Sequence, residues 1–241
     1  MIFMYKKLKK YIYECTHPVI GEVWMLHRVT NIQSNTELQR QYEITPERLE
    51  SLIMEYIGKG YKFLSIKELS ERLSGNGKQR VKFVAVTLDD GYQDNYLEAY
   101  PIFKKYNVPF CIYLLQNEIV GDAVPHYPML TKEQILDLNK EPLCTLGGHT
   151  YSHPYLGKLD KESQRKEIMR CKEWMEGLLQ KRLIDYSYPF GSYNGDTMDI
   201  MCEIGIEHCT MAWGGEIRKG KEVNKLAIPR VLVTETTKKN G

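Results

Sequence analysis

Two adjacent aspartates follow an apolar run in the first half of the chain, and they could act on a proton or hold a metal. Asp89 and Asp90 end the run at 81–88, and Gly91 comes next. Neighbouring side chains at the end of a strand point in different directions, so one carboxylate can bind a metal while the other faces a substrate water. Gly91 allows a sharp turn there. The alternative is an ordinary Asx-turn or helix cap.

Two histidines in the second half of the chain are four residues apart. His149 and His153 come directly after the apolar run at 142–148. In one helical turn this spacing directs both imidazoles to the same side. Histidine with a carboxylate is a common zinc set, and three protein ligands plus water are typical of catalytic sites. A pair of surface histidines is the alternative, but the position after a strand and the remote Asp-Asp pair favour a metal site.

A turn of proline, an aromatic residue and glycine ends a third apolar run. Pro189, Phe190 and Gly191 lie at the end of 183–189 and directly after it. A backbone N–H that is free in such a turn can donate to a developing oxyanion. The alternative is a plain tight turn without a chemical role.

Short apolar runs alternate with amphipathic stretches along the chain, which predicts a mostly parallel sheet covered by helices. Eight strand candidates favour a closed or nearly closed barrel over an open sheet. In such barrels the chemistry lies where strands end, and His27 also follows a strand there. Thr45, Thr131 and Asp160 are expected to begin helices. Strands are expected at 21–29, 61–66, 81–88, 109–115, 142–148, 183–189, 206–212 and 226–233, and helices at 45–58, 67–73, 94–106, 131–139, 160–181 and 194–204.

The composition is that of an ordinary soluble protein. The chain has 241 residues, 42% hydrophobic and 27% charged, which excludes a disordered chain, a collagen-like fibre and a multi-span membrane protein. A net charge of +2 argues against a dedicated nucleic-acid binder. We expect an N-terminal extension at 1–20 and one catalytic domain at 21–241.

The cysteines and the N-terminus indicate the compartment. Six cysteines without a C-x-x-C pair are expected to be reduced and mostly buried. The first residues are apolar and then basic, the opposite order to a secretory signal, so we expect a cytoplasmic protein. The basic segment could make a weak contact with a membrane surface, although a solvated basic end is the favoured interpretation. Its lysines are Lys6, Lys7, Lys9 and Lys10.

Taken in order, the three patterns resemble those of the polysaccharide deacetylases of the NodB type, carbohydrate esterase family four. TLDDGY at 87–92 resembles their T-F-D-D-G motif, with Leu88 in place of phenylalanine. HTYSHPYL at 149–156 matches their H-[ST]-x-x-x-H zinc motif, and YPFGSYN at 188–194 resembles their proline–aromatic–glycine motif. The resemblance covers roughly residues 20–233. It implies a distorted (β/α) barrel, in agreement with the alternation of elements.

The resemblance also implies roles for individual residues. Asp90, His149 and His153 would bind a divalent metal, with Zn²⁺ favoured and Co²⁺ or Ni²⁺ as alternatives. Asp89 would be the general base that activates the water. The backbone N–H of Phe190 would hold the oxyanion together with the metal.

The reaction implied is metal-assisted hydrolysis of an acetyl group. We expect an N-acetyl amide on a hexosamine in a glycan or glycan precursor. The alternatives are an O-acetyl esterase and a sugar-binding relative without turnover. The side chains expected to contact the carbohydrate are Tyr92, Pro189 and Tyr193.

The chain departs from the family pattern in two places. Many members have an arginine two residues before the motif proline, where this chain has Ser187. Arg230 is expected to take over and orient Asp89, because a guanidinium fork suits a carboxylate, although a surface arginine is an equal alternative. The late leucine–x–isoleucine–histidine motif is missing. However, residues 25–29 resemble the early Y-H-x-V segment of a permuted subgroup that includes biofilm-polysaccharide deacetylases. There His27 would be the general acid; a buried core histidine is the alternative.

Overall fold

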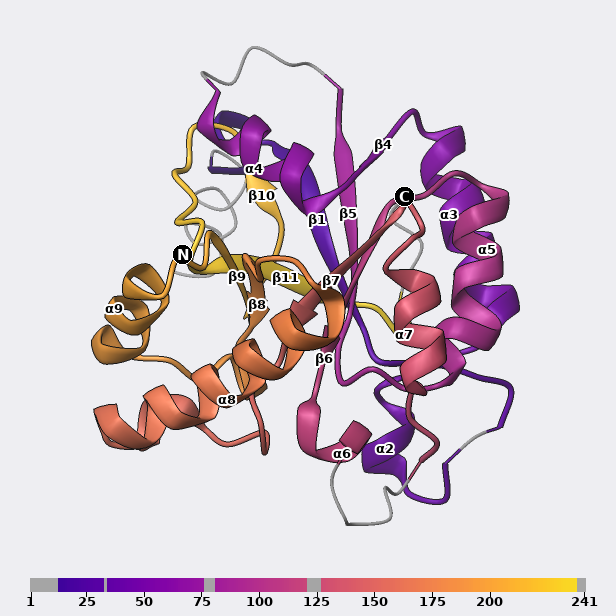
Figure 1. The fold of residues 1–241 in the computed structure, drawn as a ribbon. Coiled ribbons are helices and arrows are strands. Elements are labelled where there is room, and N and C mark those ends of the chain that lie inside the picture. Colours follow the sequence, from indigo (N-terminus) through magenta and orange to yellow (C-terminus); the bar gives the residue numbers. More distant parts are fainter. Residues whose placement is uncertain (1–12, 33, 76–80, 121–126, 238–241) are drawn as a thin grey trace.

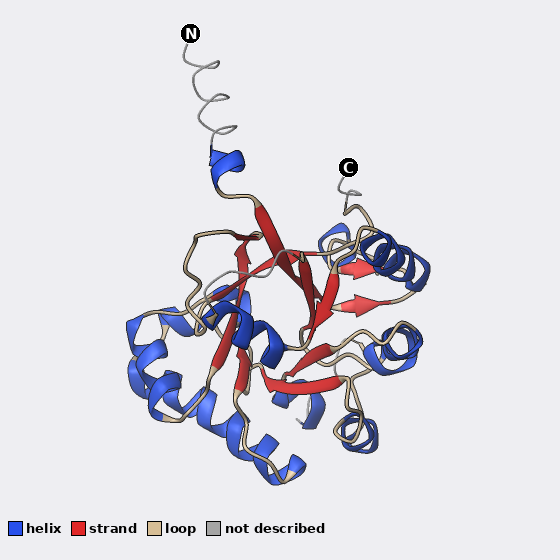
Figure 2. Cartoon of the chain, turned by 90° about the horizontal axis from the view of Figure 1, so that it is seen from above, coloured by secondary structure: helices blue, strands red, loops and turns tan. Residues whose placement is uncertain are grey.

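The structure is a computed structural model that describes residues 13–32, 34–75, 81–120 and 127–237. Within them, seven parallel strands close into a barrel with helices outside it (Figure 1), and the view from above looks into the ring of strands (Figure 2). The predicted (β/α) barrel is therefore confirmed. In ring order, the strands are β1 (Val19–Leu26), β11 (Ile228–Leu232), β9 (His208–Gly214), β8 (Asp185–Ser187), β7 (Cys144–Gly148), β6 (Phe110–Leu114) and β5 (Phe83–Leu88).

All eight strands expected from the sequence are present, but β4 (Lys62–Leu64) lies outside the ring. One edge of β5 pairs with β1 along its whole length, from Phe83 to Leu88. The other edge is shared, because β4 pairs with residues 83–85 and β6 with residues 86–88. The ring thus closes through the β1–β5 pair, which brings the end of β1 next to the end of β5.

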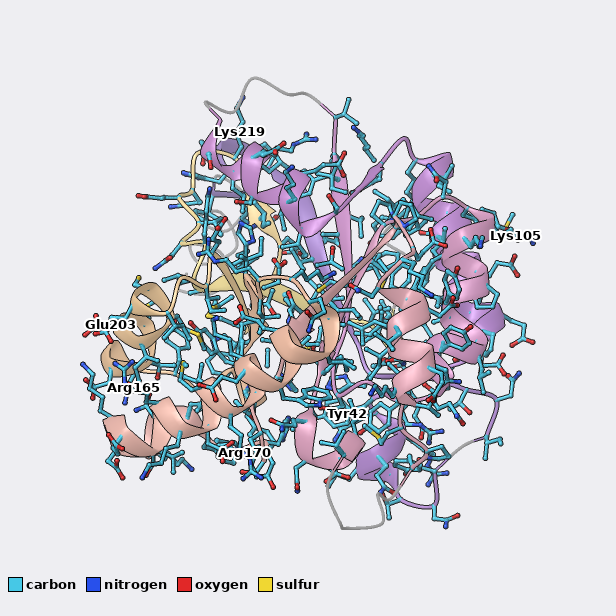
Figure 3. The ribbon with its side chains drawn as sticks, in the orientation of Figure 1. Tyr42, Lys105, Arg165, Arg170, Glu203 and Lys219 are labelled. Carbon is cyan, nitrogen blue, oxygen red and sulfur yellow. The ribbon has the colours of Figure 1, made fainter. Side chains whose placement is uncertain are left out.

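The helices begin at the caps that the sequence predicts. The side chain of Thr45 accepts from the amide of Arg48, and Thr131 and Asp160 cap their helices in the same way. Arg165 and Glu203 form a surface ion pair between α8 and α9 (Figure 3). The helices are α2 (Glu37–Arg40), α3 (Pro46–Gly58), α4 (Ile66–Ser74), a π-helix (Asn95–Ala99) continued by α5 (Tyr100–Lys105), α6 (Gln116–Val120), α7 (Lys132–Leu138), α8 (Lys161–Leu179) and α9 (Gly195–Glu203).

Several short elements were not expected from the sequence. They are α2, α6, β3 (Glu43–Ile44) and β10 (Ile217–Arg218), whereas β2 (Arg28–Val29) falls within the strand expected at 21–29. β2 pairs with β3 just beyond the end of β1. The predicted strand at 21–29 is therefore two strands, and His27 occupies the break between them.

Side chains alternate between the inside of the barrel and the helices, as a pleated strand requires. Val23, Ala85 and Tyr113 belong to a cluster that α4 joins at the end where the strands begin. Their neighbours along the strands belong to a larger cluster under the helices. A Cβ at Gly147 would lie 2.5 Å from the ring of Tyr113, so the close packing of β7 requires glycine there.

Some expectations fall outside the described residues or differ from them. Lys6, Lys7, Lys9 and Lys10 lie in the segment that the structure does not describe, so the membrane-surface contact stays a prediction. None of the described helices has the length and apolar character needed to cross a bilayer. All six cysteines are free as expected, but only three of them are buried.

Candidate active site

Three side chains from the carboxyl ends of β5 and β7 meet at one point. Nε2 of His149 lies 3.1 Å from Nε2 of His153. Oδ1 of Asp90 lies 3.5 Å and 3.6 Å from these two nitrogens. Ligand atoms about 2.0–2.1 Å from a tetrahedral zinc stand about 3.3–3.4 Å apart. The spacing therefore fits a single metal ion, and the structure brings together the three residues that the sequence groups as ligands.

The surroundings of these side chains prepare them for a cation. Nδ1 of His149 bonds the carbonyl oxygen of Ser187 at 2.8 Å, which leaves Nε2 free to face the cluster. Oδ1 of Asp90 is buried and, within the described part of the chain, has no hydrogen-bond donor. A buried acceptor of this kind requires a partner. A metal ion between the three side chains would supply it.

The backbone around the cluster is held in a sparsely populated conformation. Asp90, Thr150, His153 and Phe190 all have positive φ angles, of 74°, 69°, 61° and 54°. Positive φ is uncommon outside glycine, and such positions cluster at functional sites. The amide of His153 donates to Oγ1 of Thr150 at 3.0 Å, a local bond that helps to stabilise this turn.

Burial determines the protonation of the two histidines. It lowers the pKa of His149 and of His153 to about 4. Both imidazoles are therefore neutral at pH 7. The neutral form is the one that can bind a metal ion.

Asp89 faces the interior of the barrel and pairs with Arg230, as the sequence predicts. Nη1 and Nη2 of Arg230 donate to the two carboxylate oxygens of Asp89 at 2.7 Å and 2.6 Å. Burial opposes the ionisation of Asp89, but Arg230, together with His149 and His27, outweighs it, and the pKa of this carboxyl lies well below its usual range. Arg230 is 1% exposed, so the alternative of a surface arginine is wrong.

The guanidinium of Arg230 is fully satisfied. Besides Asp89, it donates to Oγ1 of Thr87 at 3.0 Å, to Oγ of Ser187 at 2.9 Å and to the carbonyl oxygen of Met211 at 2.5 Å. All five guanidinium N–H groups thus have acceptors. Ser187, which stands where many relatives have an arginine, is here a small partner of the arginine that comes from β11.

His27 lies beside this site without belonging to the ligand cluster. Burial is the largest influence on the pKa of Asp89 and of His153, and the charge of His27 is a smaller influence that lowers both. The ring of His27 packs against that of Tyr42, with 4.9 Å between centroids. Figure 3 shows Tyr42 near α2, at the end of the molecule opposite Lys219. His27 is partly exposed, so it is not a core histidine.

The remaining candidates have different surroundings. Phe190 is 44% exposed, and its ring lies 4.5 Å from that of His153 and 4.1 Å from that of Tyr155. Burial and the neighbouring Asp90 raise the pKa of the Tyr92 hydroxyl. Pro189 is buried. Tyr193 stacks on Tyr188, with 4.9 Å between centroids.

Sequence reasoning missed two polar side chains near the site, Asp94 and Asn95. Asp94 accepts hydrogen bonds from Arg28 and from the amide of Val29, and Asn95 donates to the carbonyl of His27. Both were expected only as the first residues of a helix. The sequence feature that could have identified them is their position five and six residues after Asp89, close to the proposed site.

Comparisons with known proteins agree on a family. Residues 76–209 match the family model of the polysaccharide deacetylases. The chain is 33% identical over 148 residues to YxkH of Bacillus subtilis (strain 168), which is 61% of this chain and 51% of that protein. It is 24% identical over 217 residues to the poly-beta-1,6-N-acetyl-D-glucosamine N-deacetylase of Staphylococcus epidermidis (strain ATCC 35984), covering 87% of this chain and 74% of that protein. The chain thus spans about half the length of the first relative.

Two solved structures share the fold. The Streptococcus pyogenes deacetylase PplD in complex with acetate has a TM-score of 0.79 at 23% identity, covering 91% of this chain and 94% of that one. IcaB from Ammonifex degensii has a TM-score of 0.78 at 23% identity, covering 90% and 92%.

We predict that the zinc affinity of the metal-free protein changes less than threefold between pH 7 and pH 5. Protons compete for the two imidazoles only near the pKa of about 4. Two histidines with an ordinary pKa of about 6.5 would lose several hundredfold in affinity over that range. Zinc competition against a chelator of known pH dependence measures this, and a loss of several hundredfold would contradict it.

We predict that Arg230→Met lowers the free energy of unfolding by about 3–5 kcal/mol, because the carboxylate of Asp89 stays buried without its partner. The double variant with Asp89→Asn should recover a large part of that loss. Arg165→Met, which breaks an exposed pair, is the matched control and should cost less than about 1 kcal/mol. Urea unfolding measures both losses. Equal losses in the two single variants would show that the buried pair stabilises the fold no more than the exposed pair does.

Proposed function

The chain belongs to the polysaccharide deacetylase family, and from this we propose that it is a metal-dependent hydrolase that removes N-acetyl groups from a hexosamine-containing glycan. One observation carries the proposal. A trio with the spacing of metal ligands stands next to an ionised carboxylate that an arginine holds in place. This combination suits the attack of a water molecule on an acyl carbon.

The metal part of the proposal rests on Asp90, His149 and His153. A divalent ion bound by them would polarise the acyl oxygen and lower the pKa of a water, which is the chemistry that such ions supply. Two nitrogens and one carboxylate oxygen suit Zn²⁺, and Co²⁺ and Ni²⁺ accept the same ligands.

The proposed base is Asp89. Arg230 keeps it ionised, so it is ready to accept a proton at neutral pH. Its low pKa makes it a weak base towards free water. The proton therefore moves as the water oxygen bonds to the acyl carbon, because the attacking water becomes strongly acidic at that moment. The two hydrogen bonds from Arg230 fix the direction in which Asp89 presents its oxygens.

His27 and Phe190 complete the proposed reaction. The amide of Phe190, in a turn with positive φ, would donate to the oxyanion as the tetrahedral state forms. His27 would then give a proton to the amine as the C–N bond breaks, because an amine cannot leave as an anion. Histidine is the side chain best suited to this transfer near neutral pH.

The substrate class is supported by the relatives. The Staphylococcus epidermidis protein that aligns with 87% of this chain is named a poly-beta-1,6-N-acetyl-D-glucosamine N-deacetylase. We propose a substrate of the same chemical class, an N-acetylated hexosamine. Tyr92, Pro189 and Tyr193 are the residues proposed to contact it.

Acetate release tests the proposal. The protein stripped with a chelator and reloaded with zinc should release acetate from N-acetylglucosamine oligomers, and the stripped protein should not. Release from O-acetylated glycans alone would replace the amidase with an esterase. No release from either class would leave a sugar-binding protein and refute the proposal.

We predict that Asp89→Asn keeps the metal and reduces kcat about 10²–10⁴-fold, the usual contribution of a general base. Metal content by atomic emission and acetate release should be measured on the same sample. Near-normal turnover at full metal occupancy would remove Asp89 from this role.

We predict that His27→Ala leaves zinc affinity and KM within about threefold of the wild type while kcat falls about 10²–10⁴-fold. The lost interaction belongs to the transition state rather than to substrate binding. A variant that loses its fold or its metal, with no separate effect on kcat, would show that the acid is another group.

A further inference from the structure

The segment from His27 to Val29 is attached at three points to the loop that follows β5. Nδ2 of Asn95 donates to the carbonyl oxygen of His27 at 2.8 Å. Asp94 accepts through Oδ2 from Nε of Arg28 at 2.9 Å and through Oδ1 from the amide of Val29 at 3.2 Å. Every residue of the segment is therefore bound by one of these two neighbouring side chains.

The two side chains are themselves held firmly. Asn95 is completely buried, and its Nδ2 also donates to Oδ1 of Asp94 at 3.1 Å. Asn95 begins the π-helix, and its amide donates to the carbonyl of Tyr92 at 3.0 Å. π-Helical turns are rare and are frequent at functional sites. The donor that reaches His27 is therefore fixed by both its backbone and its surroundings.

The ring of His27 has little else to hold it. Its Nδ1 is buried and, among the residues that the structure describes, has no hydrogen-bond partner. The imidazole of His27 packs against the ring of Tyr42, a contact that does not fix which way its nitrogens point. Since no carboxylate of the described residues hydrogen-bonds Nδ1, the position of the imidazole depends on where the main chain of His27 is held.

We propose that Asp94 and Asn95 are positioning residues that fix His27 at the distance from Asp89 at which it can protonate the leaving group. This inference rests on the proposed function, in which His27 is the acid. Asp89 follows β5, and Asn95 begins the π-helix six residues later. The amide of Asp89 donates to the carbonyl of Leu26 at 2.9 Å. The segment from Asp89 to Asn95 thus carries the proposed base and also holds the main chain of the proposed acid.

The leaving group separates this role from general damage. An amine leaves only after protonation, whereas 4-nitrophenolate leaves as an anion. A variant that misplaces His27 should therefore fail on an N-acetyl amide and keep its rate on 4-nitrophenyl acetate. A displacement of about 1 Å at a reacting group can cost about 10²-fold.

The test is Asn95→Leu, which removes the donor to His27 and keeps the volume of the side chain. We expect kcat on the N-acetyl oligomer to fall about 10–100-fold with KM within threefold. The rate on 4-nitrophenyl acetate should stay within about threefold, as it should in His27→Ala. Equal losses on both substrates, or no loss on the amide, would overturn the inference.

Asn139→Leu is the matched control. Asn139 also donates through Nδ2 to a backbone carbonyl, that of Leu179 at 3.3 Å. It lies at the end of α7, five residues before β7 begins, and so at the opposite end of the barrel from His27. The ratio of amide to aryl-ester rates should be unchanged in this variant. A change equal to that in Asn95→Leu would assign the effect to lost stability.

Hydrogen exchange decides the inference independently of turnover. The amide of Val29 loses its acceptor in Asp94→Ala, and the segment loses its attachment at the carbonyl of His27 in Asn95→Leu. In both variants the amides of residues 27–29 should therefore exchange at least about tenfold faster than in the wild type, because the segment opens more often. Exchange in β7 should be unchanged. Unchanged exchange at 27–29 would refute the positioning role. If the wild type hydrolyses the aryl ester but not the N-acetyl substrate, the proposed function is refuted. Hydrogen exchange of the backbone at residues 27–29 would still test the positioning role.

Discussion

The bidentate pair between Arg230 and Asp89 is the interaction on which the rest of this site depends. Both side chains are buried, and a buried charge that loses its partner is strongly destabilising. The arginine comes from β11 and the aspartate follows β5. Thr87 of β5, Ser187 of β8 and Met211 of β9 accept the remaining hydrogen bonds of the guanidinium. The pair can therefore form only when the ring of strands is closed. Closure of the barrel thus supplies the partner that keeps Asp89 ionised when it is buried.

The same pair determines which negative charge of the site remains for a metal ion. Arg230 balances Asp89, and the two histidines are neutral because burial lowers the pKa of each to about 4. The carboxylate of Asp90 is then left without a cationic side chain of its own among the described residues. A cation is the ligand that this arrangement lacks, so the electrostatics and the spacing of the three ligand atoms lead to the same conclusion.

The pairing of β1 with β5 connects the two halves of the proposed chemistry. It brings the end of β1 beside the loop that carries Asp89 and Asp90. Asp94 and Asn95, further along that loop, then bind the segment that contains His27. The proposed base, metal ligand and acid are thus placed by one strand pair and by the segment from Asp89 to Asn95, which limits how far they can move relative to one another.

The sequence alone determined the local features, because these depend on neighbours along the chain. Apolar periodicity predicted the eight strands, and Thr45, Thr131 and Asp160 predicted the starts of their helices. His149 and His153 do converge, but the helical turn expected from their spacing is wrong, because Thr150 and His153 have positive φ angles and the segment is an irregular turn. Motif resemblance added separate roles for Asp89 and Asp90. It could not decide whether Arg230 lies on the surface or 2.7 Å from Asp89, since those residues are 141 positions apart. Nor could it place β4 outside the ring, or attach Asn95 to the carbonyl of His27. These features follow from strand register and barrel closure, which join residues that no local pattern connects.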